Sequence, residues 1–339
     1  MILPHWIHAA LEARLEGVSR KELAAQAEKI SEQYRGKGGS EIIRTEQDAL
    51  AYALVRMPAT YAAVRHALRQ TAERAPEFQP TSLLDVGAGP GTASWAALET
   101  WDSLRQATLV DRNQPLLEVA RLAAVRCESA PALEIAQGNL PEALSKRAPA
   151  DLVLASYALT ELAPAALAEA LEKLWTQTTE MLVVVEPGTP EGFRRILQIR
   201  AWLIAHAGHI AAPCTHAEGC PLATAERWCH FSQRLPRRRD HLLVKSASVN
   251  YEDEKFSYLA VSKTPLRNDA ARRILSTPRV DKNAVRLTLC APDKVEECVI
   301  ERSDKEAYKK ARHYDWGALR AADASGALHA ADASGGPAL

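Results

Sequence analysis

The 339-residue sequence lacks the features that would place it in a membrane, disulfide-rich or fibrous class. No apolar run has the length needed to cross a bilayer. Six cysteines are too few to form a disulfide scaffold in a chain of this size. The 16 glycines and 19 prolines are near ordinary usage, which excludes a collagen-like chain. We therefore expect a globular protein of two or three packed units.

The sequence also has no net charge, because Lys+Arg and Asp+Glu both number 42. For the chain as a whole, this balance argues against a nucleic-acid partner. Residues 191–320, however, hold 24 basic residues against 16 acidic ones, which leaves 18 against 26 elsewhere. The zero is thus the sum of an acidic part and a basic part.

The first residues do not resemble a targeting segment. They have no basic stretch followed by an apolar one, and the first amphipathic segment carries Glu12, Glu16 and Glu22. Transit peptides avoid acidic residues. We expect a cytoplasmic protein with no membrane partner.

Helical sequence comes first, and alternating strands and helices follow. Residues 1–78 place apolar residues at helical spacing, and we expect Pro58 to break or begin a helix, with Thr60 near the new terminus. Within 79–210, helical segments separate five short apolar runs, at 82–87, 107–111, 133–136, 151–156 and 181–186. This alternation predicts an α/β fold, with a doubly wound parallel sheet covered by helices on both faces.

Residues 211–320 are expected to form an extension that completes the sheet. A helix near 190–209 leads into residues 211–240, which are rich in Cys, His, Pro and Arg and show no apolar periodicity. Strand-like runs follow at 242–249, 256–261 and 285–290. The tail, 321–339, repeats Ala-Ala-Asp-Ala-Ser-Gly and has too little apolar surface to pack, so we expect it to be disordered.

A glycine-rich loop, Asp85-Val-Gly87-Ala-Gly89-Pro-Gly91, ends the first strand. Glycines let the backbone approach a ligand closely, and a helix N-terminus offers unpaired N–H groups. The third glycine comes one position earlier than in the dinucleotide fingerprint, and no Walker lysine follows. Both details favour a ligand other than NAD or a nucleoside triphosphate.

Acidic residues before the glycines and at the end of the second strand are typical of S-adenosylmethionine (SAM) methyltransferases. SAM carries ribose hydroxyls, an ammonium and a sulfonium but no phosphate, so carboxylates suit it better than lysines. Asp111 would bind the ribose, and Asn139 would reach the adenine. The predicted cofactor-binding residues are Asp85, Gly87, Gly89, Gly91, Asp111 and Asn139. The alternative is that Asp85 and the glycines only shape a turn.

No residue identifies a methyl acceptor. The segment 155–161 lacks the Asn/Asp-Pro-Pro-aromatic motif of enzymes that methylate the adenine amine. The fourth and fifth strands lack the cysteine nucleophile of cytosine-carbon methyltransferases. Ser156, Tyr157 and Glu186 line the expected cleft by position only. Since methyl transfer needs little more than alignment, the catalytic residues and the enzymatic status stay open.

Three cysteines, Cys214, Cys220 and Cys229, fall within sixteen residues, and Cys290 supplies a fourth thiol. Four soft thiolates suit zinc or an iron–sulfur cluster. No pair has the two-to-four spacing usual in structural zinc sites. The spacing favours a [4Fe-4S] cluster and leaves zinc as the alternative.

Other residues compete for this role. Cys298 is the rival for the fourth position, although Glu296 and Glu297 precede it. Cys127 is expected to be an ordinary buried thiol in a helix. The two nearby histidines, His216 and His230, could replace a thiolate but are better suited to outer hydrogen bonds.

Several segments of the sequence resemble the Rsm family of methyltransferase-like small ribosomal subunit proteins. The most specific part is the cysteine block, 213–234. Further matches are at 56–61, 85–91, 186–190, 251–258 and 308–317, and the resemblance spans residues 40–317. It implies a SAM-type fold that associates with small-subunit rRNA and supports ribosome assembly or translation. It also implies a [4Fe-4S] cluster held by Cys214, Cys220, Cys229 and Cys290. We expect a bacterial member that is monomeric when free.

Basic and aromatic residues interleave in the second part of the chain. This pattern suits phosphate contacts and base stacking, as opposed to a merely solvated face. The residues are Arg234, Arg237, Arg238, Arg239, Lys305, Lys309, Lys310 and Arg312, with Trp228, Phe231, Tyr308 and Trp316. The alternatives to a ribosome-associated role are an active SAM-dependent rRNA methyltransferase and a small-molecule SAM methyltransferase with a structural zinc site.

Overall fold

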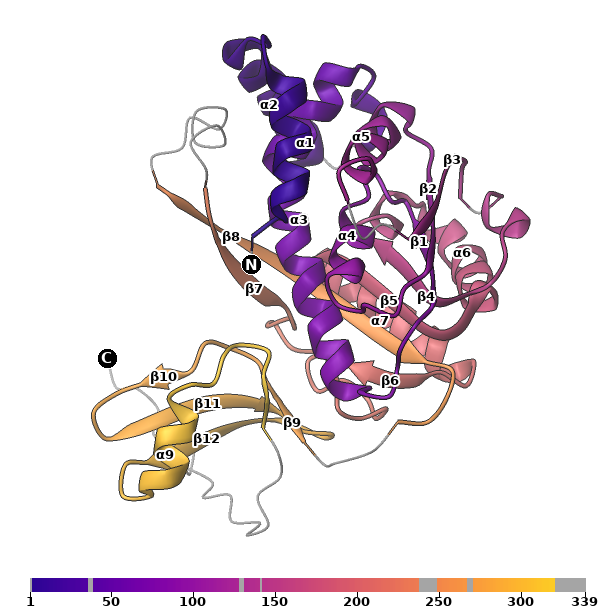
Figure 1. Cartoon of the computed structure of the whole chain (residues 1–339). Helices are drawn as coiled ribbons and strands as arrows, with labels where there is room; N and C mark the ends of the chain where they lie inside the picture. The colour runs from indigo at the N-terminus through magenta and orange to yellow at the C-terminus, as the bar shows by residue number, and fades with distance from the viewer. Residues whose placement is uncertain are drawn as a thin grey trace.

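The computed structural model describes residues 2–35, 39–127, 131–140, 142–237, 249–266 and 271–320. They form a large mixed α/β sheet with helices on both faces, and a smaller second sheet to one side (Figure 1). The prediction of an α/β fold around a parallel central sheet is confirmed. The tail 321–339, Arg238, Arg239 and most of the strand expected at 242–249 lie outside the described residues.

The large sheet has the strand order β3-β2-β1-β4-β5-β8-β6, and β7 pairs with β8. Its first five strands are parallel, whereas β8 runs antiparallel to β5, β6 and β7. The strands are β1 Ser82–Val86, β2 Gln106–Asp111, β3 Ala132–Gln137, β4 Ala150–Ser156, β5 Thr178–Pro187, β6 His209–Ala212, β7 Phe231–Pro236 and β8 Tyr251–Ser262. All five apolar runs predicted as strands are therefore strands.

Helices cover the two faces of this sheet. Successive strand side chains point to opposite faces, so Leu83 belongs to the core under α1–α5 and Leu84 to the core under α6 and α7. The helices are α1 His5–Leu15, α2 Arg20–Arg35, α3 Glu46–Arg74, α4 Thr92–Leu98, α5 Gln114–Ala124, α6 Pro164–Gln177 and α7 Pro190–Ala205, with short 3-10 turns η1 Ser40–Ile42, η2 Leu144–Lys146 and η3 Leu159–Glu161. Within the described ranges, no helix combines the length and apolar character needed to cross a membrane.

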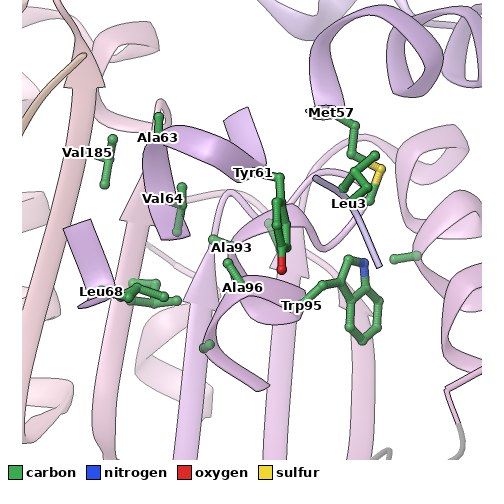
Figure 2. Close-up of a cluster of buried hydrophobic side chains, with 14 of the residues drawn as sticks. Leu3, Met57, Tyr61, Ala63, Val64, Leu68, Ala93, Trp95, Ala96 and Val185 are labelled. Carbon is green, nitrogen blue, oxygen red and sulfur yellow. The ribbon is translucent and has the colours of Figure 1, made fainter. Parts of the chain in front are cut away.

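Helix α3 is continuous over 29 residues, and the expectation that Pro58 would break it is wrong. The helix begins at a capping box, in which Thr45 and Asp48 satisfy each other's backbone N–H groups. Proline inside a helix costs about 3 kcal/mol. Burial of the neighbouring Met57 and Tyr61 outweighs this cost. In Figure 2, α3 side chains including Tyr61 pack toward α4 near Trp95.

The second sheet has the order β10-β11-β9-β13, with β12 on β11, and its own apolar core beneath helix α9. Its elements are β9 Arg272–Ile274, β10 Arg279–Val280, β11 Ala284–Cys290, β12 Val295–Glu301, α9 Lys305–Ala311 and β13 Leu319–Arg320. The predicted runs at 256–261 and 285–290 correspond to parts of β8 and β11.

The stretch 211–240 contains a regular strand, although its sequence predicted none. Strand β7 pairs with β8 from Phe231 opposite Phe256 to Pro236 opposite Tyr251. Phe231 and Leu235 lie on one buried face of β7, so a short period-2 pattern was present. The two strands project from the body as a ribbon (Figure 1).

Candidate functional site

The glycine loop lies where the strand order reverses, since β1 has β2 on one side and β4 on the other. In doubly wound sheets, ligands bind outside the carboxyl ends of the strands at this switch point. Gly87, Gly89 and Gly91 have φ angles of 70°, 54° and 77°, which L side chains rarely adopt. A Cβ at Gly87 would overlap that of Ala158, and one at Gly91 would lie 2.7 Å from the Trp95 ring. The loop therefore needs glycine for both its conformation and its packing.

Two carboxylates hold this loop in place. Asp85 is fully buried, and its Oδ2 accepts hydrogen bonds from the Ser94 amide (3.0 Å) and hydroxyl (2.6 Å). Asp111 is 9% exposed and accepts hydrogen bonds from the backbone amides of Gly89 (2.8 Å) and Asn113 (2.7 Å). Each carboxylate oxygen has a second lone pair. Asp111 thus keeps acceptor capacity at the loop surface, whereas Asp85 supports the loop from within.

Burial controls the protonation of these acids. It raises the pKa of Asp85 to about 7, against hydrogen bonds from Ser94 that lower it, and Asp111 raises it further. Burial also raises the pKa of Asp111, although hydrogen bonds from Asn113 and Gly89 oppose this. A neutral Asp85 is therefore well populated near neutral pH.

A polar connection that no sequence motif predicted crosses the ends of β2 and β4. Residues 39–43, here called the strap, lie against Glu161, whose carboxylate accepts hydrogen bonds from the Ser40 amide (3.0 Å) and hydroxyl (3.3 Å). Arg112 also pairs with Glu161 at 2.9 Å. The Asn113 side-chain amide donates to two strap carbonyls, at 3.0 and 2.8 Å. No local pattern announces these partners, which are far apart in the sequence.

Asn139 lies two residues beyond β3, and its side chain is exposed. The neighbouring Gly138 donates its amide to the Asp111 carbonyl at 2.9 Å. Asn139 therefore follows the residue that binds the Asp111 backbone, at the carboxyl end of the sheet.

The three residues expected at the cleft mouth differ in position. Tyr157 adopts a left-handed φ of 57°, and its hydroxyl donates to Glu254 at 3.0 Å. The buried hydroxyl of Ser156 has no hydrogen-bond partner among the described residues. Glu186 does not line an open cleft, because it is completely buried beside Arg195 at 3.6 Å. Burial raises the pKa of Glu186 to about 8.

Four of the six cysteines lie near one another where the two sheets meet. Cys214 and Cys220 lie in the loop after β6, Cys229 precedes β7, and Cys290 ends β11. Burial raises the pKa of Cys229, and the charges of the other three thiols raise it further. Burial, Cys214 and Cys220 likewise raise the pKa of Cys290 to about 12. The four thiols therefore influence one another, and the raised pKa values keep Cys229 and Cys290 protonated near neutral pH.

The other candidate metal ligands lie in different environments. Cys298 is 7% exposed in the apolar core of the second sheet. Cys127 is buried as expected, but it follows α5 instead of lying in the helix. The His216 Nε2 lies 3.8 Å from the Cys290 sulfur, and the His230 Nδ1 lies 3.1 Å from the Trp228 carbonyl. In the part of the chain that the structure describes, no group of three or more His, Cys, Asp or Glu is arranged to hold a metal ion.

The basic residues differ in their availability to a partner. On the β7–β8 ribbon, Arg234 forms two 2.7 Å hydrogen bonds with Asp253, and Arg237 pairs with Glu252 at 3.3 Å. The cations of α9 and of its C-cap are exposed, and none of them forms an ion pair within the described ranges. These are Lys305, Lys309, Lys310 and Arg312.

The aromatic residues also divide into two groups. Trp228, His230 and Trp316 are half-buried, with ring centroids 5.4 and 5.2 Å apart along the series. Phe231 is 1% exposed in the core, so the expectation that it could stack on a base is wrong. The Tyr308 hydroxyl donates to the Asp281 carbonyl at 2.7 Å.

The fold is thus a doubly wound α/β sheet with a glycine loop at its switch point and a thiol cluster beside its far edge. The family model described as mitochondrial small ribosomal subunit Rsm22 matches residues 46–320, and the chain belongs to this family. The human mitochondrial ribosome assembly protein METTL17 is 31% identical over 299 residues. That match covers 82% of this chain and 64% of the human protein, so the chain spans less than two thirds of its relative.

Two solved methyltransferase structures show low similarity to this chain. Magnesium protoporphyrin IX methyltransferase from Synechocystis PCC 6803 is 10% identical with a TM-score of 0.41, covering 70% of this chain and 94% of that one. Precorrin-6y C5,15-methyltransferase from Geobacter metallireducens is 13% identical with a TM-score of 0.39, covering 57% and 85%.

The free energy of unfolding of the wild type is expected to fall as the pH rises, because buried Asp85 then ionises. Asp85→Asn should abolish this fall. Folding raises the pKa of Asp85 from 3.8 to about 7. Neutral Asp85 therefore stabilises the fold below the unfolded pKa, and this contribution is lost as the pH rises through the folded pKa. Relative to the variant, the wild-type free energy of unfolding should fall by roughly 1–4 kcal/mol between about pH 4 and about pH 8. Urea unfolding measures this difference.

Asp151 provides the matched control. Burial tends to raise its pKa, but hydrogen bonds from Thr81, Ser82 and Thr179 lower it overall. Asp151→Asn should therefore leave the pH dependence unchanged above about pH 5. A difference between wild type and Asp85→Asn that is constant with pH would contradict a protonated Asp85.

Proposed function

We propose that this chain associates with the small ribosomal subunit and its rRNA and supports subunit assembly or translation. In this proposal, residues 1–78 form a helical region, 79–210 a methyltransferase-like unit that binds SAM, 211–320 a cluster-bearing extension that faces RNA, and 321–339 a tail. Membership of the Rsm22 family is the observation that carries the proposal. The assembly role of the human relative supports it.

The switch-point geometry supports SAM as the ligand of the glycine loop. Gly87, Gly89 and Gly91 bring the backbone close to the carboxyl ends of β1 and β2. Asp111 offers carboxylate acceptors at the loop, and Asn139 offers an exposed side-chain amide two residues beyond β3. In our proposal Asp111 binds the ribose and Asn139 the adenine edge.

Gly87→Ala is expected to weaken SAM binding by at least about tenfold. An alanine there would adopt a positive φ and overlap Ala158, so the loop would have to move. Gly17→Ala is the control, because Gly17 has a φ of 80° but open space around it. Isothermal titration calorimetry with SAM measures the dissociation constants, and thermal unfolding verifies that both variants fold. No SAM binding by wild type would contradict the cofactor proposal.

The chemistry of the thiol cluster supports a [4Fe-4S] cluster on Cys214, Cys220, Cys229 and Cys290. Four thiolates are the ordinary ligand set of such a cluster, and these four come together from both sheets. Cluster binding requires thiolates and releases protons. Since the described residues hold no ready arrangement for a metal ion, loading would also move the thiol side chains.

Protein purified without oxygen is expected to contain about four irons and about four labile sulfides, with absorbance near ~400 nm. Cys290→Ser should lose most of this iron. Cys298→Ser should keep it, because Cys298 lies in the core of the second sheet. Iron, zinc and sulfide analysis measures the outcome. Colourless wild-type protein with stoichiometric zinc would contradict the cluster.

Exposed cations on α9 support contact with rRNA. The helix carries Lys309 and Lys310 in its last turn, free of ion pairs within the described ranges. Arg234 and Arg237 on the ribbon are already paired with acidic residues. Phosphate contacts therefore fit α9 better than the ribbon arginines that the structure describes.

Lys309→Glu combined with Lys310→Glu is expected to weaken binding to small ribosomal subunits by roughly tenfold or more and to flatten its salt dependence. Lys173→Glu with Arg121→Glu makes the same charge change on α6 and α5, and should have little effect. Co-sedimentation over a salt series measures both. Equal losses in the two double variants would show a non-specific charge effect and contradict a role for α9.

A further inference from the structure

Arg200 on α7 is 6% exposed and points into the cysteine-bearing loop. Its guanidinium donates to the backbone carbonyls of His216 at 2.9 Å and Glu218 at 2.7 Å. Both carbonyls lie between Cys214 and Cys220 in the sequence. Arg200 therefore fixes the backbone that carries these two thiols.

Arg273 on β9 approaches the same loop from the second sheet and is only 1% exposed. Its Nε donates to the Pro213 carbonyl at 2.7 Å, and its Nη1 donates to the Gly317 carbonyl at 2.7 Å. It also donates to the side-chain carbonyl of Gln70 on α3. Two buried arginines thus hold the loop from two directions.

Neither guanidinium forms an ion pair with a carboxylate within the described ranges, although other partly buried arginines do. Arg195 pairs with Glu186, Arg237 with Glu252. A buried charge costs several kcal/mol unless an opposite charge and hydrogen bonds compensate it. Carbonyl dipoles alone leave the charges of Arg200 and Arg273 without a counter-ion.

The groups that carry the thiols lie next to both arginines. The carbonyls that Arg200 binds lie between Cys214 and Cys220, and the carbonyl that Arg273 binds directly precedes Cys214. Arg273 also lies opposite Cys290 in the pairing of β9 with β11. The two cations are therefore placed beside the segments that carry three of the four thiols.

We propose that Arg200 and Arg273 are the charge-compensating and positioning residues of the four-cysteine site. This inference rests on the proposed cluster and extends it to residues that are not ligands. Four thiolates around a doubly charged metal core carry a net charge of about −2, which two buried guanidiniums balance. The two arginines are then an electrostatic cost in the empty protein and a stabilising pair in the loaded one.

The experiment compares wild type with Arg200→Gln, Arg273→Gln and Arg273→Lys, each purified without oxygen. Arg147→Gln is the control, since Arg147 pairs with Glu134 at the opposite edge of the main sheet. Three quantities are measured: the rate of iron loss to a chelator, the midpoint potential of the cluster, and the urea midpoint of the metal-free protein.

Both Gln variants should lose iron about tenfold faster than wild type. Their midpoint potentials should be more negative, because removal of a cation disfavours the more negative reduced cluster. Arg273→Lys should keep the wild-type potential while losing iron faster, since it retains the charge but not the fork of donors. The metal-free Gln variants should unfold at a urea concentration no lower than metal-free wild type. Arg147→Gln should match wild type in iron loss and potential.

Each failure has its own signature. Wild-type protein without iron and sulfide would overturn the cluster proposal and this inference with it. Iron in wild type, with unchanged iron loss and potential in both Gln variants, would overturn this inference alone. Lower urea midpoints in the metal-free Gln variants, with an unchanged midpoint potential, would show that the two arginines only stabilise the fold. This result would also overturn the inference.

Discussion

The buried guanidinium of Arg273 is the contact on which the relation of the two sheets depends. From β9 it reaches Gln70 on α3, the Pro213 carbonyl in the cysteine loop and the Gly317 carbonyl before β13. One buried side chain thus joins the second sheet, the long helix and the cysteine loop, against which the Cys290 sulfur lies 3.8 Å from the His216 Nε2. The Arg273 Nη2 has no hydrogen-bond partner among the described residues. These hydrogen bonds therefore set the arrangement of the three elements, while the buried charge offsets their contribution to stability.

Strand β8 connects this region to the carboxyl end of the main sheet. Near its start, Glu254 accepts the Tyr157 hydroxyl at 3.0 Å and pairs with Arg56 of α3 at 3.3 Å. Three residues later, the Ser257 hydroxyl donates to the Cys229 carbonyl at 2.8 Å. One strand therefore contacts both the end of β4 and the thiol loop. Tyr157 holds a left-handed φ at this junction, a strained conformation typical of functional sites.

The sequence predicted β1, β2, β4 and β5 well because strands covered on both faces are continuously apolar. It failed where tertiary contacts decide the outcome. Pro58 stays within α3 because the residues around it are buried against the sheet. Strands β9, β10 and β13 have only two or three residues, too few for a pattern. No sequence motif predicts the roles of Arg200 and Arg273, because folding alone brings their guanidiniums to the carbonyls of the cysteine loop.

The number of basic residues in the sequence likewise does not predict which of them are available to a partner. The surplus of basic residues in 191–320 is a property of the sequence, but pairing decides how much of it a partner could use. Arg234 and Arg237 are neutralised by acidic residues on the adjacent strand, since cross-strand neighbours in a ribbon face each other. On α9, Asp304 caps the N-terminus and Lys309 and Lys310 occupy the last turn, where the helix dipole favours cations. The dipole stabilises these lysines without an acidic partner, which leaves their charge directed outward.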